Sequence, residues 1–289
     1  MHHNLSKESE QKLQDTIAPF SHFATLEFIH RNGEFSHIWK KIKNKHHFSE
    51  DIFYKLATPS LFPQYNKIII SDVDVVFLGS VIEEFEAFNV NEDYLVGGVV
   101  SNDPELFFPI PKKGYRSGYR RFNASELKAL QYGIAGGYLI VNTKQWRLKA
   151  TEQKALDYLK QNYQKLILHE QDILSICCYP HIKKIHPSHI VCHSSWNAWG
   201  ENFQKLIANI YTQEEITQMC STPIQIHYVG GAKPWNTPSV PKSELWFEYL
   251  CKTPFLRDFL IKFEKSIIQN YKKSLLQHRI CTKIKSLLR

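Results

Sequence analysis

The order of apolar and polar positions along the chain predicts strands and helices that follow one another. Segments rich in apolar residues at 23–29, 68–70, 94–100 and 138–141 are typical of strands, and helical spacing of apolar positions marks residues 48–62, 81–88 and 145–163. This alternation predicts an α/β fold with a mostly parallel sheet. Ligands of such folds bind beyond the carboxyl ends of the strands.

One predicted strand ends in two acidic residues. Asp72 and Asp74, separated only by Val73, follow directly after the apolar run at 68–70. Buried carboxylates repel each other unless a cation lies between them, and oxygen ligands suit hard ions such as Mg²⁺ or Mn²⁺. The pattern predicts a divalent metal site that serves a phosphate-bearing ligand. A solvated turn at the end of the strand is the alternative for such a short motif on its own.

Composition narrows the class of protein. The chain has 289 residues, 43% of them hydrophobic and 13% aromatic, enough for the core of one domain with or without an appendage. The longest apolar runs fall short of the roughly 20 residues that span a bilayer, and the polar start does not resemble a signal peptide. We therefore expect a cytoplasmic protein. Its six cysteines lack paired spacing, which favours reduced thiols.

The net charge of +8 is concentrated near the C-terminus. Residues 241–289 contain 11 Lys and Arg against 4 Asp and Glu, and Phe255, Phe259, Phe263 and Ile267 recur there at every fourth position. This predicts a domain at 1–240 and a basic amphipathic helical tail at 241–289 that lies on an anionic membrane surface. A basic helix packed on the domain, with its lysines in water, is the alternative. The charge comes without a nucleic-acid-binding motif, so we expect no nucleic-acid partner.

A second basic segment lies between two predicted strands. Residues Pro111–Arg121 contain two glycines and five cations. The segment is either an ordinary surface loop or a loop that binds an anionic acceptor, such as a phosphorylated saccharide core. Arginine favours the second interpretation, because its guanidinium binds phosphate through two parallel hydrogen bonds.

Four motifs in fixed order carry a family resemblance, because their joint occurrence is far more specific than any one of them. They are Asp72–Asp74, Tyr132–Asn142, Glu170–Asp172 and His227–Trp235. Residues 52–235 resemble the retaining glycosyltransferases of family 8, which include bacterial lipopolysaccharide glucosyl- and galactosyltransferases and glycogenin-like enzymes. The resemblance implies a GT-A-type, Rossmann-like mixed sheet flanked by helices. It also implies transfer of glucose or galactose from a UDP-sugar to a lipopolysaccharide or other surface glycan at the inner membrane face.

The resemblance implies a metal site and a set of donor contacts. Asp72, Asp74 and His227 would hold Mn²⁺, with Mg²⁺ as the alternative; the imidazole modestly favours Mn²⁺. Gly230 would let the backbone approach the diphosphate, and Lys233 would place a positive charge beside it. The complete set of donor-contacting residues that we expect is Lys55, Asp72, Val73, Asp74, Ala135, Gly136, Gly230 and Lys233. For Lys55, a solvated helix lysine is the alternative.

The motif Glu170-Gln171-Asp172 is expected to supply the catalytic residues. By resemblance, Gln171 stands at the β-face of the donor sugar, and Glu170 binds sugar hydroxyls and stabilises developing positive charge. The family mechanism implied is attack by the acceptor hydroxyl from the face of the leaving phosphate.

The chain departs from the family pattern in three places. Ile134 stands where the family has a sugar-binding asparagine, and Glu170 replaces an aspartate. The loss of one such hydrogen bond would cost roughly 1–3 kcal/mol. The segment at residues 2–8 resembles the part of the family that follows the second strand, so we expect a chain that lacks the first β-α-β segment, which holds the uridine. The alternatives to an active transferase are an inactive remnant that binds glycan or membrane, and a metal-dependent phosphohydrolase.

Overall fold

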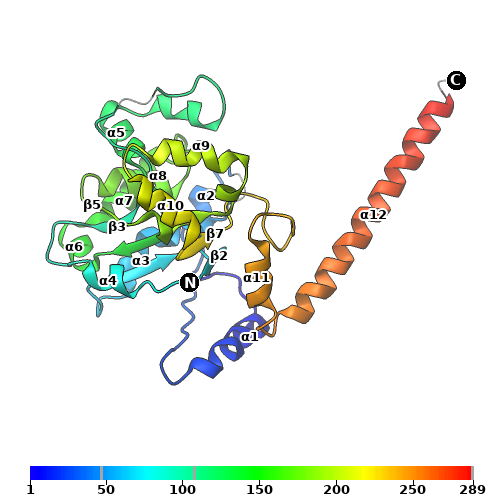
Figure 1. Cartoon of the computed structure of the whole chain (residues 1–289), viewed down its shortest axis with the longest axis horizontal. Coiled ribbons are helices and arrows are strands. Elements are labelled where there is room, and N and C mark those ends of the chain that lie inside the picture. The colour runs from blue at the N-terminus through cyan, green and yellow to red at the C-terminus, as the bar shows by residue number, and fades with distance from the viewer. Residues whose placement is uncertain (46–47, 107–108, 288–289) are drawn as a thin grey trace. The chain divides into compact units, whose positions relative to one another are not determined.

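Figure 1 shows a computed structural model of the chain, which describes residues 1–45, 48–106 and 109–287. The chain divides into two compact units. The first consists of Met1–His3 and Ile29–Gly231, and the second of Asn4–Phe28 and Ala232–Arg289. The boundary expected at residue 240 stays a prediction.

The first unit contains two mixed β-sheets. The four-stranded sheet has the order β1 (Ile68–Ser71), β4 (Ile134–Val141), β3 (Val96–Val100) and β5 (Ile182–Lys184). The three-stranded sheet has the order β2 (Val75–Phe77), β7 (Gln225–His227) and β6 (Val191–Cys192). Strand β4 is antiparallel to both of its neighbours, and only β3–β5 and β6–β7 are parallel pairs among the described strands. The expected α/β class with a mixed sheet is confirmed, but the prediction of a mostly parallel sheet is wrong.

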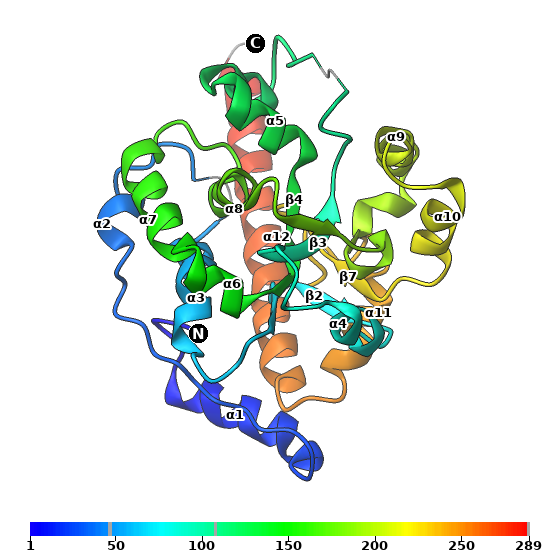
Figure 2. The same cartoon turned by 90° about the vertical axis from the view of Figure 1, so that its left-hand side faces the viewer.

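Helices flank these sheets. In Figure 2, α3, α6, α7 and α8 lie together on one side of β4, and α9 and α10 lie on the other. The helices of this unit are α2 (Ser36–Trp39), α3 (Tyr54–Leu61), α4 (Ile82–Ala87), α5 (Ala124–Tyr132), α6 (Thr143–Leu148), α7 (Thr151–Asn162), α8 (Glu170–Cys178), α9 (Ala198–Ile207) and α10 (Gln213–Ser221). Its 3₁₀ helices are η2 (Glu50–Phe53), η3 (Tyr115–Arg121), η4 (Pro187–His189) and η5 (His193–Trp196).

Strand β4 lies at the centre of the core. Tyr138, Leu139 and Ile140 are fully buried, and Trp146 of α6 is 1% exposed. Burial on both faces explains why this strand has a continuous apolar run instead of alternating polar residues. The register pairs Ser71 of β1 with Tyr138, so the residue that follows β1 lies beside the middle of β4.

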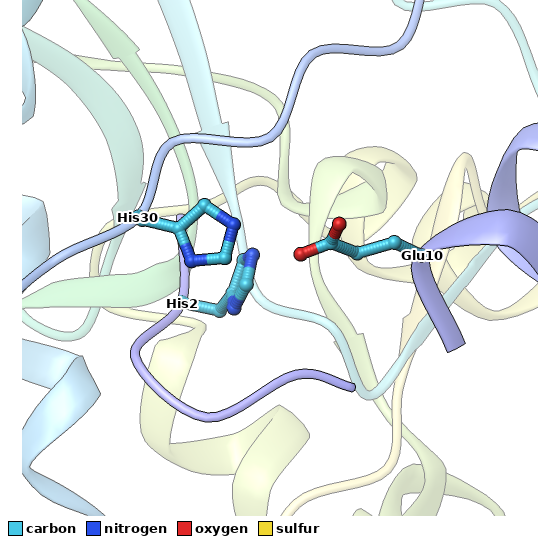
Figure 3. Close-up of side chains that lie close together, drawn as sticks. All are labelled: His2, Glu10 and His30. Carbon is cyan, nitrogen blue, oxygen red and sulfur yellow. The ribbon is translucent and has the colours of Figure 1, made fainter. Parts of the chain in front are cut away.

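Two sequence-based elements differ from the structure. The expected helix over 145–163 is two helices, because Ala150 adopts the left-handed conformation with φ 50° and interrupts the hydrogen-bond ladder. The expected strand at 23–29 is wrong, since these residues form no strand. The chain next to them makes one short bridge instead, between His2 and His30. Their rings meet edge to face with centroids 4.2 Å apart (Figure 3).

The second unit is helical. It contains α1 (Lys7–Ile17), η1 (Ala18–Phe20), α11 (Ser243–Leu250) and α12 (Leu256–Leu287), and α12 is one uninterrupted helix (Figure 1). The Ser6 hydroxyl caps α1 by accepting a hydrogen bond from the Ser9 amide at 3.2 Å. Lys12 of α1 forms an ion pair with Asp258 of α12. Among the described residues, no helix is both long enough and apolar enough to cross a bilayer.

The apolar face of α12 is only partly covered. Phe259 packs against Trp246 of α11 with centroids 5.5 Å apart, and Phe263 stacks on Phe259 at 5.6 Å. Further along the same helix, Ile267 is 53% exposed and Tyr271 is 64% exposed. The helical tail therefore packs on α11 at its beginning and presents apolar side chains to solvent beyond Phe263.

Candidate active site

The acidic motif lies between two strands of different sheets. Asp72 follows β1, and its amide donates to the Gly137 carbonyl of β4 at 3.1 Å. The Asp74 carbonyl accepts from the Tyr228 amide at 2.9 Å, and β2 begins at the next residue. The side chain of Val73 between them is fully exposed. The chain therefore turns at Val73 while both aspartates are held by backbone hydrogen bonds to other segments.

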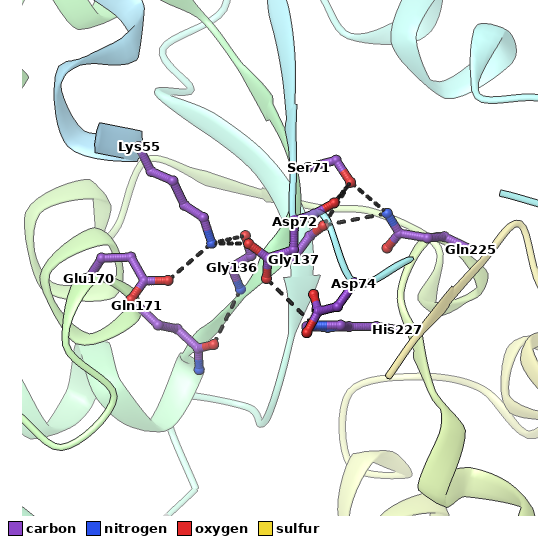
Figure 4. A network of polar contacts seen from close by, with 10 residues as sticks. All are labelled: Lys55, Ser71, Asp72, Asp74, Gly136, Gly137, Glu170, Gln171, Gln225 and His227. Carbon is purple, nitrogen blue, oxygen red and sulfur yellow. Dashed lines mark hydrogen bonds and ion pairs between the residues drawn. The ribbon is translucent and has the colours of Figure 1, made fainter. Parts of the chain in front are cut away.

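His227 brings a third potential ligand to the aspartates. It is the last residue of β7, and the strand register pairs it with Val75, the residue after Asp74. Its Nε2 lies 3.1 Å from Asp74 Oδ1 and 3.5 Å from Asp72 Oδ2 (Figure 4). One potential ligand atom from each of the three side chains lies within 4.8 Å of the others.

This donor set fits a hard or borderline divalent cation. It offers carboxylate oxygens and one imidazole nitrogen, a combination that Mn²⁺ accepts readily and Mg²⁺ less so. The side chains of Asp72, Asp74 and His227 are 25%, 19% and 13% exposed. Partial exposure leaves room for coordination by a further ligand, such as a phosphate oxygen.

Lys55 of α3 connects the aspartates to α8. Its Nζ lies 2.5 Å from Asp72 Oδ1 and 3.0 Å from Glu170 Oε1, and it also donates to the Gly136 carbonyl at 3.0 Å. Only 9% of Lys55 is exposed, so it is not the solvated helix lysine that was the alternative. Burial by itself lowers the pKa of Lys55, but the charges of Glu170 and Asp72 outweigh it and raise that pKa above its ordinary value. The lysine therefore stays charged between two carboxylates.

Glu170 and Gln171 begin α8 beside the same glycine. The Gln171 side chain accepts a hydrogen bond from the Gly136 amide at 3.3 Å. Glu170 is 5% exposed, and its Oε2 makes no hydrogen bond to any residue that the structure describes. A methyl group on Gly136 would lie 3.4 Å from Glu170 Oε1. A side chain at this position would thus meet its neighbours at ordinary contact distance. The structure brings together Lys55, Asp72, Gly136, Glu170 and Gln171.

Asp172 faces away from this group. Its Oδ2 accepts hydrogen bonds from the amides of Ile167 and Leu168 at 2.7 and 2.9 Å, and its Oδ1 accepts one from the Tyr119 hydroxyl at 3.2 Å. Burial raises the pKa of the Asp172 carboxyl, and these hydrogen bonds oppose that rise. The contacts of Asp172 fix the loop before α8, so a catalytic role for it stays a prediction.

Three further residues are expected from the sequence to contact the donor: Gly230, Lys233 and Ala135. Gly230 has φ 77°, a conformation that side chains other than glycine rarely adopt, and the space beside it is open. Lys233 is 8% exposed, and its amide donates to Asn236 Oδ1 at 2.8 Å within the second unit. Ala135 of β4 is partly exposed. For these three residues, contact with a donor stays a prediction.

Ile134 is a core residue. It begins β4, is fully buried, and its amide donates to Ser175 Oγ of α8 at 3.1 Å. A methyl group on Gly98 of β3 would lie 2.6 Å from the Ile134 side chain, so the isoleucine fills the space that this glycine leaves. The hydrocarbon thus packs inside the fold and offers nothing polar to a sugar.

Two polar residues near the site, Gln225 and Ser71, are not predicted from the sequence as part of it. Gln225 Nε2 donates to Ser71 Oγ at 2.9 Å, and Ser71 Oγ donates to the Gly137 carbonyl at 3.3 Å (Figure 4). Gln225 stands two positions before His227 on β7, which puts both side chains on the same face of that strand. This spacing of two residues from His227 could have identified Gln225 from the sequence as a neighbour of the site. The contact orients the strand that delivers Asp72.

Comparison with known proteins identifies the family and the fold of this chain. The model of glycosyl transferase family 8 matches residues 1–238. General stress protein A of Bacillus subtilis is 18% identical over 256 residues, which cover 86% of this chain and 80% of that protein. The glycosyltransferase GlyF of Streptococcus pneumoniae is 24% identical over 201 residues, 66% of this chain and 45% of GlyF.

Solved structures show the same architecture. A crystal structure of the galactosyltransferase LgtC with donor and acceptor sugar analogs has a TM-score of 0.64 and 17% identity, over 88% of this chain and 84% of LgtC. The bifunctional WbbM glycosyltransferase has a TM-score of 0.62 and 19% identity, over 89% of this chain and 44% of WbbM. The chain thus spans less than half the length of WbbM and of GlyF.

These likenesses define a GT-A-type glycosyltransferase fold, as expected from the sequence. Because the family model covers most of the chain, the chain belongs to glycosyltransferase family 8. The predicted enzyme class, a glycosyltransferase, is confirmed by the same findings.

Proposed function

We propose that the chain is a metal-dependent retaining hexosyltransferase that moves glucose or galactose from a UDP-sugar to a lipopolysaccharide or other surface glycan. The observation that carries the proposal is the convergence of Asp72 and Asp74, from the turn between β1 and β2, with His227, from the end of β7, with potential ligand atoms within 4.8 Å. A phosphohydrolase would need more carboxylates around the ion than this group provides.

The three ligands suit the chemistry at the diphosphate. Breaking the bond between sugar and phosphate increases negative charge on the leaving UDP. A divalent cation held by Asp72, Asp74 and His227 would neutralise that charge as a Lewis acid. The role we propose for Lys233 is to add a second positive charge at the same phosphate, and Gly230 would allow close backbone approach.

The beginning of α8 suits the sugar end of the donor. Glu170 Oε2 is buried and lacks a described protein partner, so a sugar hydroxyl can donate to it. Gln171 is held by the Gly136 amide and would stand at the β-face of the sugar. Attack by the acceptor hydroxyl from the side of the leaving phosphate would then retain the configuration. In this scheme, Lys55 holds Glu170 and Asp72 in place.

We further propose that α12 attaches the protein to the anionic cytoplasmic face of the inner membrane. Its exposed side chains include apolar ones, such as Leu260 and Ile267, and basic ones, such as Lys262 and Lys265. Apolar area and positive charge on one helix together favour adsorption to anionic lipid. Vesicles of phosphatidylglycerol should therefore bind the intact chain and bind K262Q/K265Q/K272Q more weakly, whereas phosphatidylcholine vesicles should bind neither.

The direct test of the proposed reaction is release of UDP from UDP-glucose and UDP-galactose with Mn²⁺. We expect turnover by the intact chain and a loss of at least about a hundredfold in Asp72→Asn and His227→Ala, because each removes a metal ligand. Turnover without dependence on Mn²⁺, or turnover that both substitutions leave unchanged, would contradict the proposal.

A further inference from the structure

Two basic segments lie outside the proposed donor site. The first is residues 40–45 with Lys40, Lys41, Lys43 and Lys45, and the second is residues 111–121 with Lys112, Lys113, Arg116, Arg120 and Arg121. Residues 35–49 and 106–125 contain no Asp or Glu. We call these two segments together the basic rim. Nine cations without intervening acid form a strongly positive surface wherever the fold places them side by side.

The structure fixes the first segment to the residue before α8. His169, fully buried with φ 46°, packs edge to face against Trp39 at 5.5 Å between ring centroids. Phe48 packs against the same imidazole at 5.3 Å. The lysines at 40–45 therefore stand in the sequence between two aromatic residues that both pack on His169. Lys45 also lies over the Trp39 ring, 5.6 Å from its centroid.

The second segment is fixed to the same part of the chain. Gly118 of η3 packs against Ile167, and Arg121 donates to the Gln164 carbonyl at 3.4 Å. The Tyr119 hydroxyl donates to Asp172 Oδ1 at 3.2 Å. Both segments of the basic rim thus border residues 164–172. That stretch leads into α8, whose first two residues are the proposed sugar contacts.

Five lysines of the basic rim are available to a ligand. Lys40, Lys41, Lys43, Lys112 and Lys113 are all exposed, and none forms an ion pair with a carboxylate in the described part of the chain. Arg120 and Arg121 donate to the carbonyls of Ile110 and Gly118, which orders their side chains without neutralising them. The positive charge of these five lysines is therefore not balanced by carboxylates of the described residues.

We propose that the basic rim binds phosphate groups on the acceptor glycan, an inference that rests on the proposed transfer to a glycan. Lysine and arginine bind phosphate oxygens through charged hydrogen bonds, and a surface of one sign raises the association rate of an oppositely charged ligand. The aromatic residues Trp39, Phe48 and Tyr119 are turned to the protein by the contacts given above. They offer no stacking platform for bases, which favours a phosphorylated saccharide over a nucleic acid.

A binding measurement without donor tests this inference separately from catalysis. The probe is fluorescein-labelled maltoheptaose bearing phosphate monoesters, compared by anisotropy with the same oligosaccharide after phosphatase treatment. The rim variant is K40Q/K41Q/K43Q/K112Q/K113Q. The matched control removes five exposed lysines of the second unit, K252Q/K262Q/K265Q/K272Q/K273Q. Both substitute exposed side chains only, and equal thermal unfolding midpoints would show that both remain folded.

We expect the intact chain to bind the phosphorylated probe at least about tenfold more tightly than the phosphatase-treated one. The rim variant should lose most of that difference in affinity, and the control variant of the second unit should keep it. Equal binding of the two probes, or an equal loss in rim and control variants, would overturn the proposal. So would a DNA oligonucleotide of the same charge that competes as well as the phosphorylated probe. If the rim binds as expected but UDP release fails, the proposed reaction is wrong and the binding surface stands.

Discussion

Lys55 Nζ lies 3.0 Å from Glu170 Oε1 in an ion pair that is almost fully buried. The same ammonium group lies 2.5 Å from Asp72, so one lysine touches both the proposed metal ligand and the proposed sugar contact. A buried ion pair contributes little net stability in itself, but removal of one partner leaves the other charge uncompensated. Loss of Lys55 would therefore affect both the proposed metal site at Asp72 and the proposed sugar contact at Glu170.

Lys55→Met should lower the free energy of unfolding by about 3–5 kcal/mol, because Glu170 and Asp72 then lose their cation. The measurement is urea unfolding of the single variants and of Lys55→Met combined with Glu170→Gln. The double variant should be more stable than the sum of the single losses predicts, since the neutral amide no longer needs the lysine. Strict additivity of the two substitutions would contradict the coupling.

Two substitutions of Asp172 distinguish a structural role of this residue from a catalytic one. Asp172→Ala should cost about 2–4 kcal/mol of stability, because the buried amides of Ile167 and Leu168 lose their acceptor. Asp172→Asn should cost less than about 1 kcal/mol, since the amide oxygen can still accept both hydrogen bonds. If Asp172 acts only by fixing this loop, the asparagine variant keeps its UDP release. A large loss of turnover in a stable Asp172→Asn protein would instead establish a catalytic role.

Two adjacent glycines allow a matched test of the metal site. A methyl group on Gly137 would lie 2.7 Å from His227 Nδ1 and 2.5 Å from the Ile190 side chain, whereas one on Gly136 would lie 3.4 Å from its nearest neighbour. Gly137→Ala should therefore displace His227 and weaken Mn²⁺ binding by about tenfold or more. Gly136→Ala should leave Mn²⁺ binding within about threefold, because it crowds Glu170 and not the ligands. Similar Mn²⁺ affinities for the two variants would show that His227 is not a ligand.

The lowered pKa of Glu126 predicts how the free energy of unfolding depends on pH. Burial raises the pKa of this carboxyl, but hydrogen bonds from Lys165, Tyr158 and the Asn123 amide outweigh it and hold the pKa below its ordinary value of 4.5. A carboxyl with a lowered pKa in the folded state stabilises the protein above the ordinary value, and this contribution disappears as the pH falls through 4.5 and below. Glu126→Gln should therefore be less stable than the intact chain at pH 7 by about 1–2 kcal/mol, and the gap should narrow on acidification. A gap that stays constant with pH would contradict this assignment.

The acidic motif could be predicted because its signal is local. An apolar run followed by Asp72 and Asp74 reports a strand and the residues at its end, whatever surrounds them. The family resemblance supplied His227, which local reasoning alone could not have joined to the aspartates. What joins them in space is the antiparallel pairing of Val75 with His227.

Other features depended on pairing that a single sequence does not report. The direction of β4 is one example, because a strand buried on both faces has the same continuous apolar run whether it is parallel or antiparallel. The contact between Gln225 and Ser71 is another, since it depends on the order and register of β1, β4, β2 and β7. The interruption between α6 and α7 at Ala150 could not be predicted from the local sequence either, because alanine is a strong helix former.

Asp72, Asp74 and His227 are proposed to bind one divalent cation. Electron paramagnetic resonance of free Mn²⁺ during titration measures this directly, without donor or acceptor. A matched control is Asp93→Asn/His181→Ala, which removes an exposed carboxylate–imidazole pair 3.0 Å apart elsewhere in the same unit. We predict one bound Mn²⁺ per chain, lost in Asp74→Asn and His227→Ala and kept in the control. Mn²⁺ binding that survives in Asp74→Asn and His227→Ala, or its absence from the intact chain, would contradict this proposal.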